Sequence, residues 1–456
     1  MKLHPPTPDI PEDDPFKNDL FGRKELGDSL LSLFKTTQES VVLCLDAPWG
    51  EGKTTFARMW LADLKRQGLN CIYFNAYSHD YADDPFIAFC GEILSLAEKS
   101  FADDKAIQAL KRDFKSKAKK IGAKLLGTTA RIGTKALTLG ILKDSDIDAI
   151  DSLRTDIADA ASSKLSSFMD KVLEDYVSSK QTLDDFRAKL SALGKAVRDK
   201  QGFPLLIVVD ELDRCRPDFA LSLIEQIKHL FSAQDVSFLL LANTAQLQNY
   251  AKALYGAEVD AVNYLRKFFT LTVSLPCDRI SGNQNDYWKY SRRLAEHYEM
   301  KGQYDMALLT ALFRHYGVSL REMENCFAIL AIYYAQLPKN RLSCPLTIPL
   351  LAVMRLRRPD IFARLAQKQM SYDDLIRTTE INLLGSSEFT ESTKDWFLDR
   401  LKYLLYSNEQ INLTKDTKDI SYHAQWLAPY MGMSRNEVIP FFCSELTRFK
   451  MELPPS

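Results

Sequence analysis

The sequence is poor in the residues that build metal sites and disulfide frameworks. Its eight cysteines are scattered and none belongs to a C-x-x-C pair, which argues against a zinc site or a disulfide framework and favours reduced thiols in a cytosol. The six histidines are dispersed as well. Charge is balanced, because 59 Lys and Arg residues face 60 Asp and Glu residues and leave a net charge of −1. The chain as a whole therefore has no electrostatic attraction to nucleic acid or anionic lipid, and such a partner would need a local patch.

Segments that direct a chain to a membrane are missing too. Residues 1–15 are rich in Pro and Asp and lack the apolar core of a signal peptide. The one run long enough to test as a membrane span, residues 123–142, contains Lys124, Arg131 and Lys135. Each charge at the centre of a bilayer costs about 2.5–3.5 kcal/mol, so three of them exclude a span. The sequence therefore predicts a cytoplasmic protein without a membrane span.

What the chain does contain is an ordinary globular composition, 46% hydrophobic and 26% charged over 456 residues. That length predicts roughly three domains of about 150 residues. Up to residue 275, short apolar runs rich in β-branched and aromatic residues alternate with helical patterns. The runs cover residues 41–47, 70–76, 205–210, 236–243 and 269–275. Strands alternating with helices predict a three-layer α/β domain around a five-stranded, mostly parallel sheet.

A long segment, residues 101–201, separates the second predicted strand from the third. From Lys111 to Lys135 it has nine basic residues and one acid, with apolar side chains on one helical face. An acidic stretch follows at residues 144–159. Two interpretations are open: a helical subdomain whose two halves attract each other, or a basic surface for nucleic acid, a membrane interface or a partner.

Helical patterns dominate after residue 276, and prolines at 338, 345 and 349 punctuate a boundary near residue 340. We therefore predict four parts. They are a core of residues 1–100 and 202–276, a helical insert at 101–201, a helical lid at 277–340 and an all-helical C-terminal domain at 341–456.

The strongest motif begins at Ala47 and ends with Gly52-Lys53-Thr54. It matches the phosphate-binding loop G-x-x-x-x-G-K-[ST] except for Ala at the first position, and it follows a strand and opens a helix, as the motif requires. Glycines at positions 50 and 52 allow main-chain N–H groups to point at phosphate oxygens, and the helix N-terminus adds its positive dipole end. Lys53 is expected to reach the β- and γ-phosphates of ATP, and the Thr54 hydroxyl to ligate Mg²⁺. The predicted nucleotide-binding residues of the loop are Pro48, Trp49, Gly50, Glu51, Gly52, Lys53, Thr54 and Thr55.

A second motif is Asp210-Glu211-Leu-Asp-Arg-Cys215, which ends a fully apolar strand. A buried carboxylate needs a counter-ion, so Asp210 is a candidate to hold Mg²⁺ through its hydration shell. Glu211 points to the other side and is expected to orient or deprotonate an attacking water. By itself such a strand end is more often a helix cap, and only its pairing with the phosphate loop makes the interpretation specific.

The fourth predicted strand ends in Asn243. If the sheet has the order 5-1-4-3-2, this strand lies between the strand of the loop and the acidic strand. Asn243 then faces the γ-phosphate and its water as a sensor. The alternative is a turn-forming Asn that caps the helix starting at Thr244.

Four features together resemble the KAP family of P-loop NTPases. They are the N-terminal motif Asp19-Leu-Phe21-Gly-Arg23, the sequence Pro-Trp-Gly within the loop, the strand Tyr73-Phe-Asn75-Ala-Tyr77, and the acidic motif that starts at Asp210. The resemblance covers roughly residues 16–335. Two positions depart from the family pattern, since Tyr77 stands where Trp is usual and Ala47 replaces Gly, but neither departure threatens nucleotide binding.

The resemblance implies further properties. Phe21 to Arg23 would lie near the adenine base, and an all-helical lid would follow the fifth strand. Many family members carry a pair of membrane helices where this chain has its basic insert, so the chain resembles a soluble branch. Many soluble bacterial relatives belong to antiviral defence systems, and on this analogy we expect self-association and other subunits of a defence complex as partners.

The position of the catalytic arginine stays open. Arg266 precedes the fifth strand, where related ring ATPases place an arginine finger that acts on a neighbour's nucleotide; a surface helix arginine is the alternative. Arg214 and Arg216 beside the acidic strand are other candidates. Arg321, which opens a lid helix, resembles a second sensor of bound nucleotide.

These residues favour an Mg²⁺-dependent ATPase that acts as a switch or an assembly motor in a multi-protein complex. The residues expected to take part in catalysis are Lys53, Glu211, Asn243 and Arg266. Two other functions compete with this one: a scaffold that binds nucleotide without turnover, and a P-loop kinase. The kinase is the weakest, because such enzymes do not usually need a Glu directly after the Asp on a strand separated from the loop by another strand.

Overall fold

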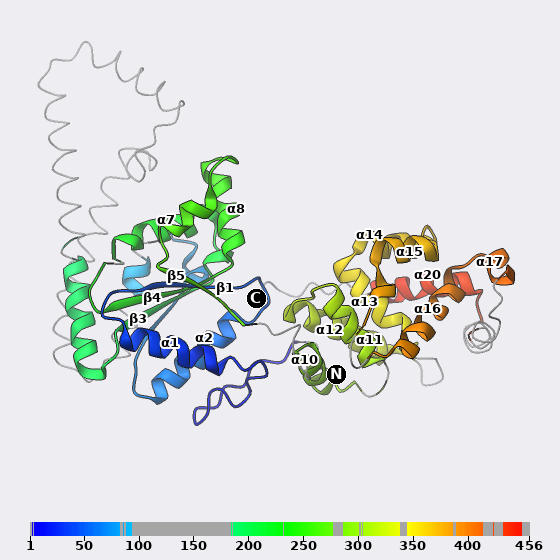
Figure 1. Ribbon diagram of the computed structural model, residues 1–456, viewed down its shortest axis with the longest axis horizontal. Coiled ribbons are helices and arrows are strands. Elements are labelled where there is room, and N and C mark those ends of the chain that lie inside the picture. Colours follow the sequence, from blue (N-terminus) through cyan, green and yellow to red (C-terminus); the bar gives the residue numbers. More distant parts are fainter. Residues whose placement is uncertain are drawn as a thin grey trace, which may run out of the picture.

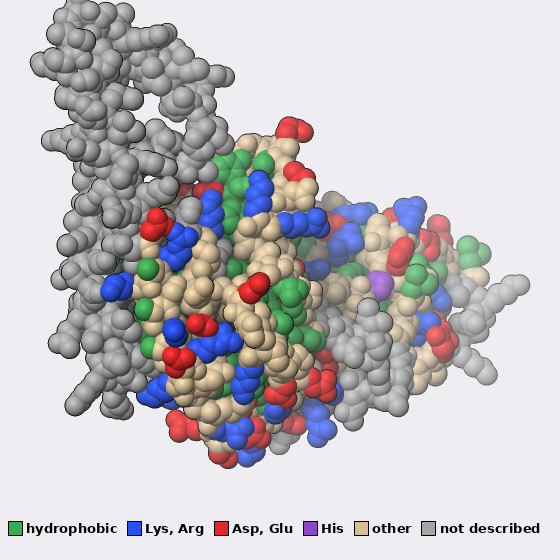
Figure 2. All heavy atoms as spheres, turned by 60° about the vertical axis from the view of Figure 1, so that its left-hand side comes forward, with side chains coloured by type: hydrophobic (Ala, Val, Ile, Leu, Met, Phe, Trp, Pro, Cys, Tyr) green, Lys and Arg blue, Asp and Glu red, His purple; other side chains and the backbone are tan. Residues whose placement is uncertain are grey.

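The computed structural model describes residues 2, 4–82, 85, 88–93, 184, 186–230, 232–276, 286–300, 302, 304–337, 344–385, 389–413, 423 and 432–448. The basic stretch from Lys111 to Lys135 and the acidic stretch after it lie outside these residues. Figure 1 shows an α/β body built from the described residues up to 276 and a body of helices built from the described residues after 285. On the face drawn in Figure 2, basic and acidic side chains are interspersed, as the balanced composition leads one to expect.

All five predicted strands form, and they make one sheet. The strands are β1 (Val42–Asp46), β2 (Ile72–Asn75), β3 (Leu205–Asp210), β4 (Val236–Ala242) and β5 (Leu271–Ser274). Their order is β2-β3-β4-β1-β5 and every pair is parallel, which confirms the predicted order 5-1-4-3-2. The interior strands β3 and β4 are buried along their whole length, which explains why their sequences are continuous apolar runs.

Helices cover both faces of the sheet. They are α1 (Lys24–Thr36), α2 (Lys53–Arg66), α7 (Pro217–Ile227), α8 (Thr244–Tyr255) and α9 (Ala261–Arg266), with short 3-10 helices η1 (Tyr77–His79), η2 (Leu212–Arg214) and η3 (Lys228–Leu230). Alternate side chains of β1 point to opposite faces of the sheet. Leu43 packs in the cluster that contains Phe56 and Trp60 of α2, while Cys44 packs in the cluster that contains residues of α7 and α8. This arrangement is the three-layer α/β core that the sequence predicts (Figure 1).

The end of the predicted insert belongs to the same core. Residues 186–201 are helical, and Phe186, Leu190 and Val197 are buried in the cluster on the α7 and α8 face. The part of the insert that the structure describes therefore packs on the sheet. The outer boundaries of the insert stay a prediction.

After residue 276 the described residues form helices, as predicted. These helices are α10 (Asp286–His297), α11 (Met306–His315), α12 (Leu320–Gln336), α13 (Thr347–Arg357), α14 (Pro359–Ala366), α15 (Tyr372–Thr379), α16 (Glu391–Leu405), α17 (Asn408–Leu413) and α20 (Arg435–Thr447), with the 3-10 helix η4 (Ile381–Leu383). Within the described ranges, no helix combines the length and the apolar character that crossing a membrane requires.

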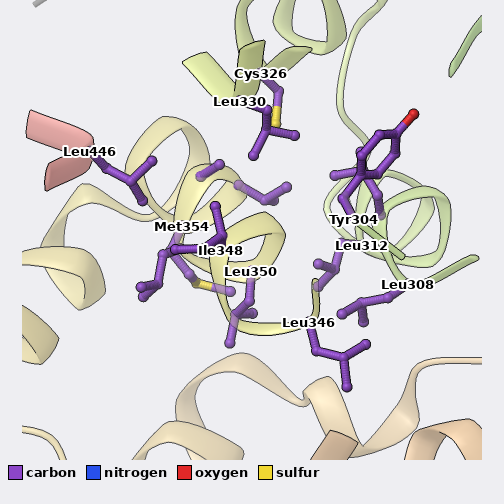
Figure 3. Close-up of a cluster of buried hydrophobic side chains, with 14 of the residues drawn as sticks. Tyr304, Leu308, Leu312, Cys326, Leu330, Leu346, Ile348, Leu350, Met354 and Leu446 are labelled. Carbon is purple, nitrogen blue, oxygen red and sulfur yellow. The ribbon is translucent and has the colours of Figure 1, made fainter. Parts of the chain in front are cut away.

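One hydrophobic cluster runs through these helices. Figure 3 shows Leu312 of α11 and Leu330 of α12 directed toward Leu350 and Met354 of α13, with Leu446 of α20 at the edge of the group. The cluster extends across the boundary predicted near residue 340, so the predicted lid and the predicted C-terminal domain share apolar contacts. Their division into two domains stays a prediction.

Candidate nucleotide-binding site

The phosphate loop connects β1 to α2 at the carboxyl edge of the sheet. Gly50 and Gly52 have φ of 82° and 80°, in the left-handed region that favours glycine. α2 begins at Lys53, and its N-cap residue is Gly52, which has no side chain to cap the first-turn N–H groups. The loop and the helix N-terminus together therefore offer main-chain donors of the kind that bind phosphate.

Lys53 folds back over its own loop and is only 8% exposed. Its ammonium group donates to the main-chain oxygens of Ala47 and, over 3.4 Å, Pro48, and it forms an ion pair with the carboxylate of Asp213 over 3.3 Å. The lysine is thus directed along the loop and meets Asp213 of the acidic motif, a residue whose role the sequence does not predict.

Asp213 reaches the loop because the chain turns sharply after β3. Glu211 has φ of 62°, and η2 follows at once, which returns the chain toward the loop. Residue Asp213 is 2% exposed, and its carboxylate accepts hydrogen bonds from the Trp49 indole N–H over 2.9 Å and from the Asn243 main-chain N–H over 2.8 Å. The sequence signal for this residue is its spacing, three positions after the last residue of an apolar strand.

The two predicted metal ligands lie together. Asp210 ends β3 and is 1% exposed, and its carboxylate accepts hydrogen bonds from the Glu211 N–H over 2.7 Å and from the Tyr73 hydroxyl over 2.8 Å. The Thr54 hydroxyl lies near this carboxylate. Burial raises the pKa of the Asp210 carboxyl, and the hydroxyls of Tyr73 and Thr54 act in the opposite direction. A carboxylate next to a hydroxyl beside a phosphate loop suits Mg²⁺, which keeps several waters and takes few protein ligands. Among the residues that the structure describes, no group of three or more His, Cys, Asp and Glu could hold a metal by itself.

Glu211 is held by two partners. Asn75 of β2 donates to one carboxylate oxygen over 2.9 Å, and Arg214 contacts the other over 3.0 Å. Asn75 pairs with Asp210 in the sheet register, and Tyr73 lies two residues earlier on the same face of β2. The two polar residues of β2 therefore each hold one of the two adjacent acids. The sequence predicts no role for either residue, although two polar residues two positions apart on a strand beside an acidic strand end are a signal for this contact.

The first turn of α12 lies against the loop. The N–H of Arg321 donates to the main-chain oxygen of Gly50 over 3.3 Å, and a Cβ placed on Gly50 would come within 2.8 Å of the Arg321 Cβ. A capping box between Ser319 and Glu322 starts this helix. Burial and then the neighbouring Arg214 lower the pKa of the Arg321 guanidinium, which Glu324 and Glu211 oppose. The structure thus brings Arg321, the predicted second sensor, to the loop.

The N-terminal motif braces the loop from another side. Arg23 is 2% exposed and donates to the main-chain oxygens of Glu51 over 2.8 Å and Gly52 over 3.4 Å. Its guanidinium lies 4.7 Å from the centre of the Phe21 ring, and that ring is 5.9 Å from the ring of Tyr290 in α10. The predicted place of Phe21 to Arg23 near an adenine base stays a prediction, whereas the contacts of Arg23 with the loop are direct.

Three further predicted residues, Asn243, Arg266 and Arg216, have contacts with neighbouring side chains or main chain. Asn243 is the N-cap of α8 and accepts from the Gln246 N–H over 3.4 Å, so the geometry of the helix-cap interpretation is present while the sensor role stays a prediction. Arg266 is exposed at the end of α9, where it donates to Asn263 over 3.3 Å. Arg216 pairs with Asp80 over 3.1 Å.

Comparison with known protein families identifies the family of this chain. The sequence pattern of the KAP family P-loop domain matches residues 25–337. This chain belongs to the KAP family. The match agrees with the resemblance found from the motifs and identifies the chain as a P-loop NTPase of that family, with nucleotide as its ligand.

Other comparisons add little about this KAP protein. None of the curated proteins matches the chain. Among solved structures, the ORC2 protein of Aeropyrum pernix in its ADPNP-ADP complexes is 12% identical, with a TM-score of 0.33 over 93% of this chain and 94% of that chain. The same protein in its ADP form is 12% identical, with a TM-score of 0.34 over 97% and 95%. Similarity this low carries no information about function.

Proposed function

We propose that this KAP protein binds ATP with Mg²⁺ and hydrolyses the bond to the γ-phosphate, and that hydrolysis serves as a switch or an assembly motor in a multi-protein complex. The observation that carries the proposal is that the acidic motif at the end of β3 meets the phosphate loop, where Asp213 pairs with Lys53 over 3.3 Å and Asp210 lies near Thr54 at the start of α2. These groups have the chemistry of a magnesium–triphosphate site.

Each group has a defined task in this proposal. The N–H groups around Gly50 and Gly52 bind phosphate oxygens, and the Lys53 ammonium neutralises charge on the β- and γ-phosphates. Thr54 and Asp210 would hold Mg²⁺, which when bound supplies further charge neutralisation. The remaining residues of the loop, Pro48, Trp49, Glu51 and Thr55, shape the same binding surface.

Glu211 is proposed to orient the attacking water and accept its proton. Each carboxylate oxygen has two lone pairs, so the hydrogen bond from Asn75 and the ion pair with Arg214 leave room for a water donor. These two partners would fix the direction of the carboxylate. Asn243, at the end of β4, is proposed to sense the γ-phosphate.

Transition-state charge would be stabilised by an arginine. Arg321 is favoured within one chain, because the first turn of α12 already contacts Gly50. Arg266 is exposed on α9, and this favours action on the nucleotide of a second copy in a self-associated form. Contact between α12 and the loop also gives a route by which bound nucleotide would change the position of the helical half.

The wider setting is proposed on analogy with the family. We propose a cytoplasmic protein that self-associates and joins other subunits of a complex, with bacterial antiviral defence as the setting. Nucleic acid is proposed as a ligand of the segment from Lys111 to Lys135. Its test is a binding shift with DNA and RNA that weakens as salt rises, and an absent or salt-insensitive shift contradicts it.

Release of inorganic phosphate from ATP tests the enzyme proposal. We expect release that requires Mg²⁺, that Lys53→Ala abolishes, and that Glu211→Gln lowers by about 10²-fold or more while ATP binding persists. Lys65→Ala is the matched control, because Lys65 lies exposed on the same helix. GTP in place of ATP shows the base preference.

The same assay separates the two alternatives. A scaffold without turnover predicts no release from the parent protein, with nucleotide binding that Lys53→Ala removes and Glu211→Gln leaves intact. A P-loop kinase predicts transfer of labelled γ-phosphate to an acceptor other than water.

A further inference from the structure

A single carboxylate oxygen of Asp213 gathers three donors from two parts of the chain. The Trp49 indole N–H and the Lys53 ammonium come from the phosphate loop, at 2.9 and 3.3 Å, and the Asn243 N–H comes from the end of β4, at 2.8 Å. Donors converging on one negatively charged oxygen form an anion site. In this protein the anion is one of its own side chains.

The Asp213–Lys53 ion pair is buried, with side-chain exposures of 3% and 9%. Charges in such surroundings are poorly solvated by water and depend on each other for stabilisation. The ammonium that would neutralise a bound phosphate is therefore already neutralised by a carboxylate. A phosphate group and Asp213 need the same cation.

We propose that Asp213 competes with bound phosphate for the Lys53 ammonium and thereby sets the affinity of the loop for nucleotide. This inference rests on the proposed nucleotide site and adds to it a residue that positions the lysine. Asp213 acts through Lys53 and does not itself contact the phosphates.

The contacts around the two residues indicate which of them moves. Asp213 is anchored at both its carboxylate and its main chain, because two neutral N–H donors hold the carboxylate and the Tyr250 hydroxyl donates to its main-chain oxygen over 2.8 Å. Lys53 has a flexible four-carbon side chain. A phosphate would therefore draw the lysine away while Asp213 keeps its bonds to Trp49 and Asn243.

Calorimetric titration with ADP in the absence of Mg²⁺ tests the competition. Asp213→Asn keeps an oxygen that accepts from Trp49 and Asn243 but removes the charge that binds Lys53. Because phosphate no longer has to displace a carboxylate from Lys53, we expect the Kd for ADP to fall about tenfold or more, which corresponds to about 1.4 kcal/mol or more. A side chain with only a structural role would give the opposite sign, since its replacement would weaken binding.

Asp46→Asn is the matched control. Asp46 ends β1 beside the loop, and its carboxylate accepts the Thr244 N–H over 2.8 Å. Removing this charge tests whether the loss of any nearby negative charge strengthens the binding of anionic ADP. We expect the Kd for ADP to change by less than about twofold. An equal fall in Kd for Asp46→Asn and Asp213→Asn would overturn the competition for Lys53.

The remaining outcomes are also decisive. Thermal unfolding reports whether the Asp213→Asn protein folds. If it does not fold, Asp213→Ser, which also lacks the charge, is used in its place. An unchanged or higher Kd in the folded variant overturns the role of Asp213 while the proposed function stands. A parent protein that binds no ADP or ATP, and in which Lys53→Ala changes nothing, overturns both.

Discussion

The Tyr73 hydroxyl donates a hydrogen bond of 2.8 Å to the carboxylate of Asp210 on the adjacent strand. Burial of the Tyr73 ring raises the pKa of its hydroxyl, so the group stays protonated and remains a donor. The hydrogen bond from Tyr73 of β2 thus fixes the orientation of the Asp210 carboxylate in the site. In the proposed function this bond prepares the carboxylate for Mg²⁺.

Tyr73→Phe is expected to weaken the use of Mg²⁺. A hydrogen bond to a charged group contributes about 1.5–3 kcal/mol, so we expect the Mg²⁺ concentration for half-maximal phosphate release to rise roughly tenfold. The measurement is a Mg²⁺ titration at saturating ATP. Tyr81→Phe is the control, because Tyr81 is 84% exposed. If both variants keep the parental half-saturation, the Tyr73 bond has no part in holding the metal.

Stability as a function of pH tests the environment of Asp210. Burial raises the pKa of its carboxyl above the ordinary 3.8, so the folded protein takes up this proton more readily than the unfolded chain. The resulting contribution to stability is complete below the unfolded pKa and is lost as pH rises through the folded pKa. Asp210→Asn removes a buried charge, and we expect its advantage in unfolding free energy to be largest at neutral pH and to shrink on acidification.

Asp260 provides a control of opposite sign. Hydrogen bonds from Asn263 lower the pKa of the Asp260 carboxyl, so its contribution to stability is present above the unfolded pKa and is lost as pH falls through the folded value. Asp260→Asn should therefore be less stable than the parent at neutral pH, and the difference should vanish in acid. Chemical denaturation across this pH range measures both variants, and the same sign for both would contradict the assignment.

Gly50 is expected to tolerate no side chain. Alanine there would adopt φ of 82° and would place its Cβ 2.8 Å from the Arg321 Cβ, so α12 would have to move off the loop. Gly68→Ala is matched for strain, because Gly68 has φ of 78° with nothing within 4 Å of an added Cβ. We expect the free energy of unfolding of each variant to fall by about 1–2 kcal/mol because of backbone strain. Only Gly50→Ala is expected to lose nucleotide binding as well. Nucleotide binding by a folded Gly50→Ala protein would show that the contact of α12 with the loop is dispensable.

The sequence predicts the core of this fold well because the determining signals are local. Buried parallel strands have both faces covered, so β3 and β4 show as apolar runs whose bounds differ little from the observed ones. The phosphate loop is recognised from a short motif between a strand and a helix. The predicted strand order 5-1-4-3-2, which puts the fourth strand between the loop strand and the acidic strand, is confirmed by the observed sheet.

What the sequence did not predict depends on contacts between distant segments. Arg23 bonds to Glu51, 28 residues away, and no periodicity reports such a contact. Asp213 reaches Lys53 only because Glu211 adopts φ of 62°, a conformation that is uncommon for a residue with a side chain. The helix at residues 186–201 shows an amphipathic pattern that would fit either a separate insert or a layer on the sheet, and only its burial in the core distinguishes these.

Arg266 is expected to act on the nucleotide of a second copy. It is exposed at the end of α9, and its described contact is with Asn263 on the same helix. An arginine finger contributes about 10³-fold or more to turnover, so Arg266→Ala should lower phosphate release by that order without weakening ATP binding. Lys267→Ala, at the adjacent exposed position, is the control and should keep the parental rate.

Mixing two inactive variants distinguishes action between copies from action within one chain. Lys53→Ala protein cannot use nucleotide but still presents Arg266, whereas Arg266→Ala protein binds nucleotide but lacks the arginine. If the arginine acts between copies, the mixture hydrolyses ATP although neither variant does so alone, and the rate rises with protein concentration. A mixture as inactive as its components, measured where the parent is active and self-associated, would assign the arginine to the same chain and make Arg321 the stronger candidate.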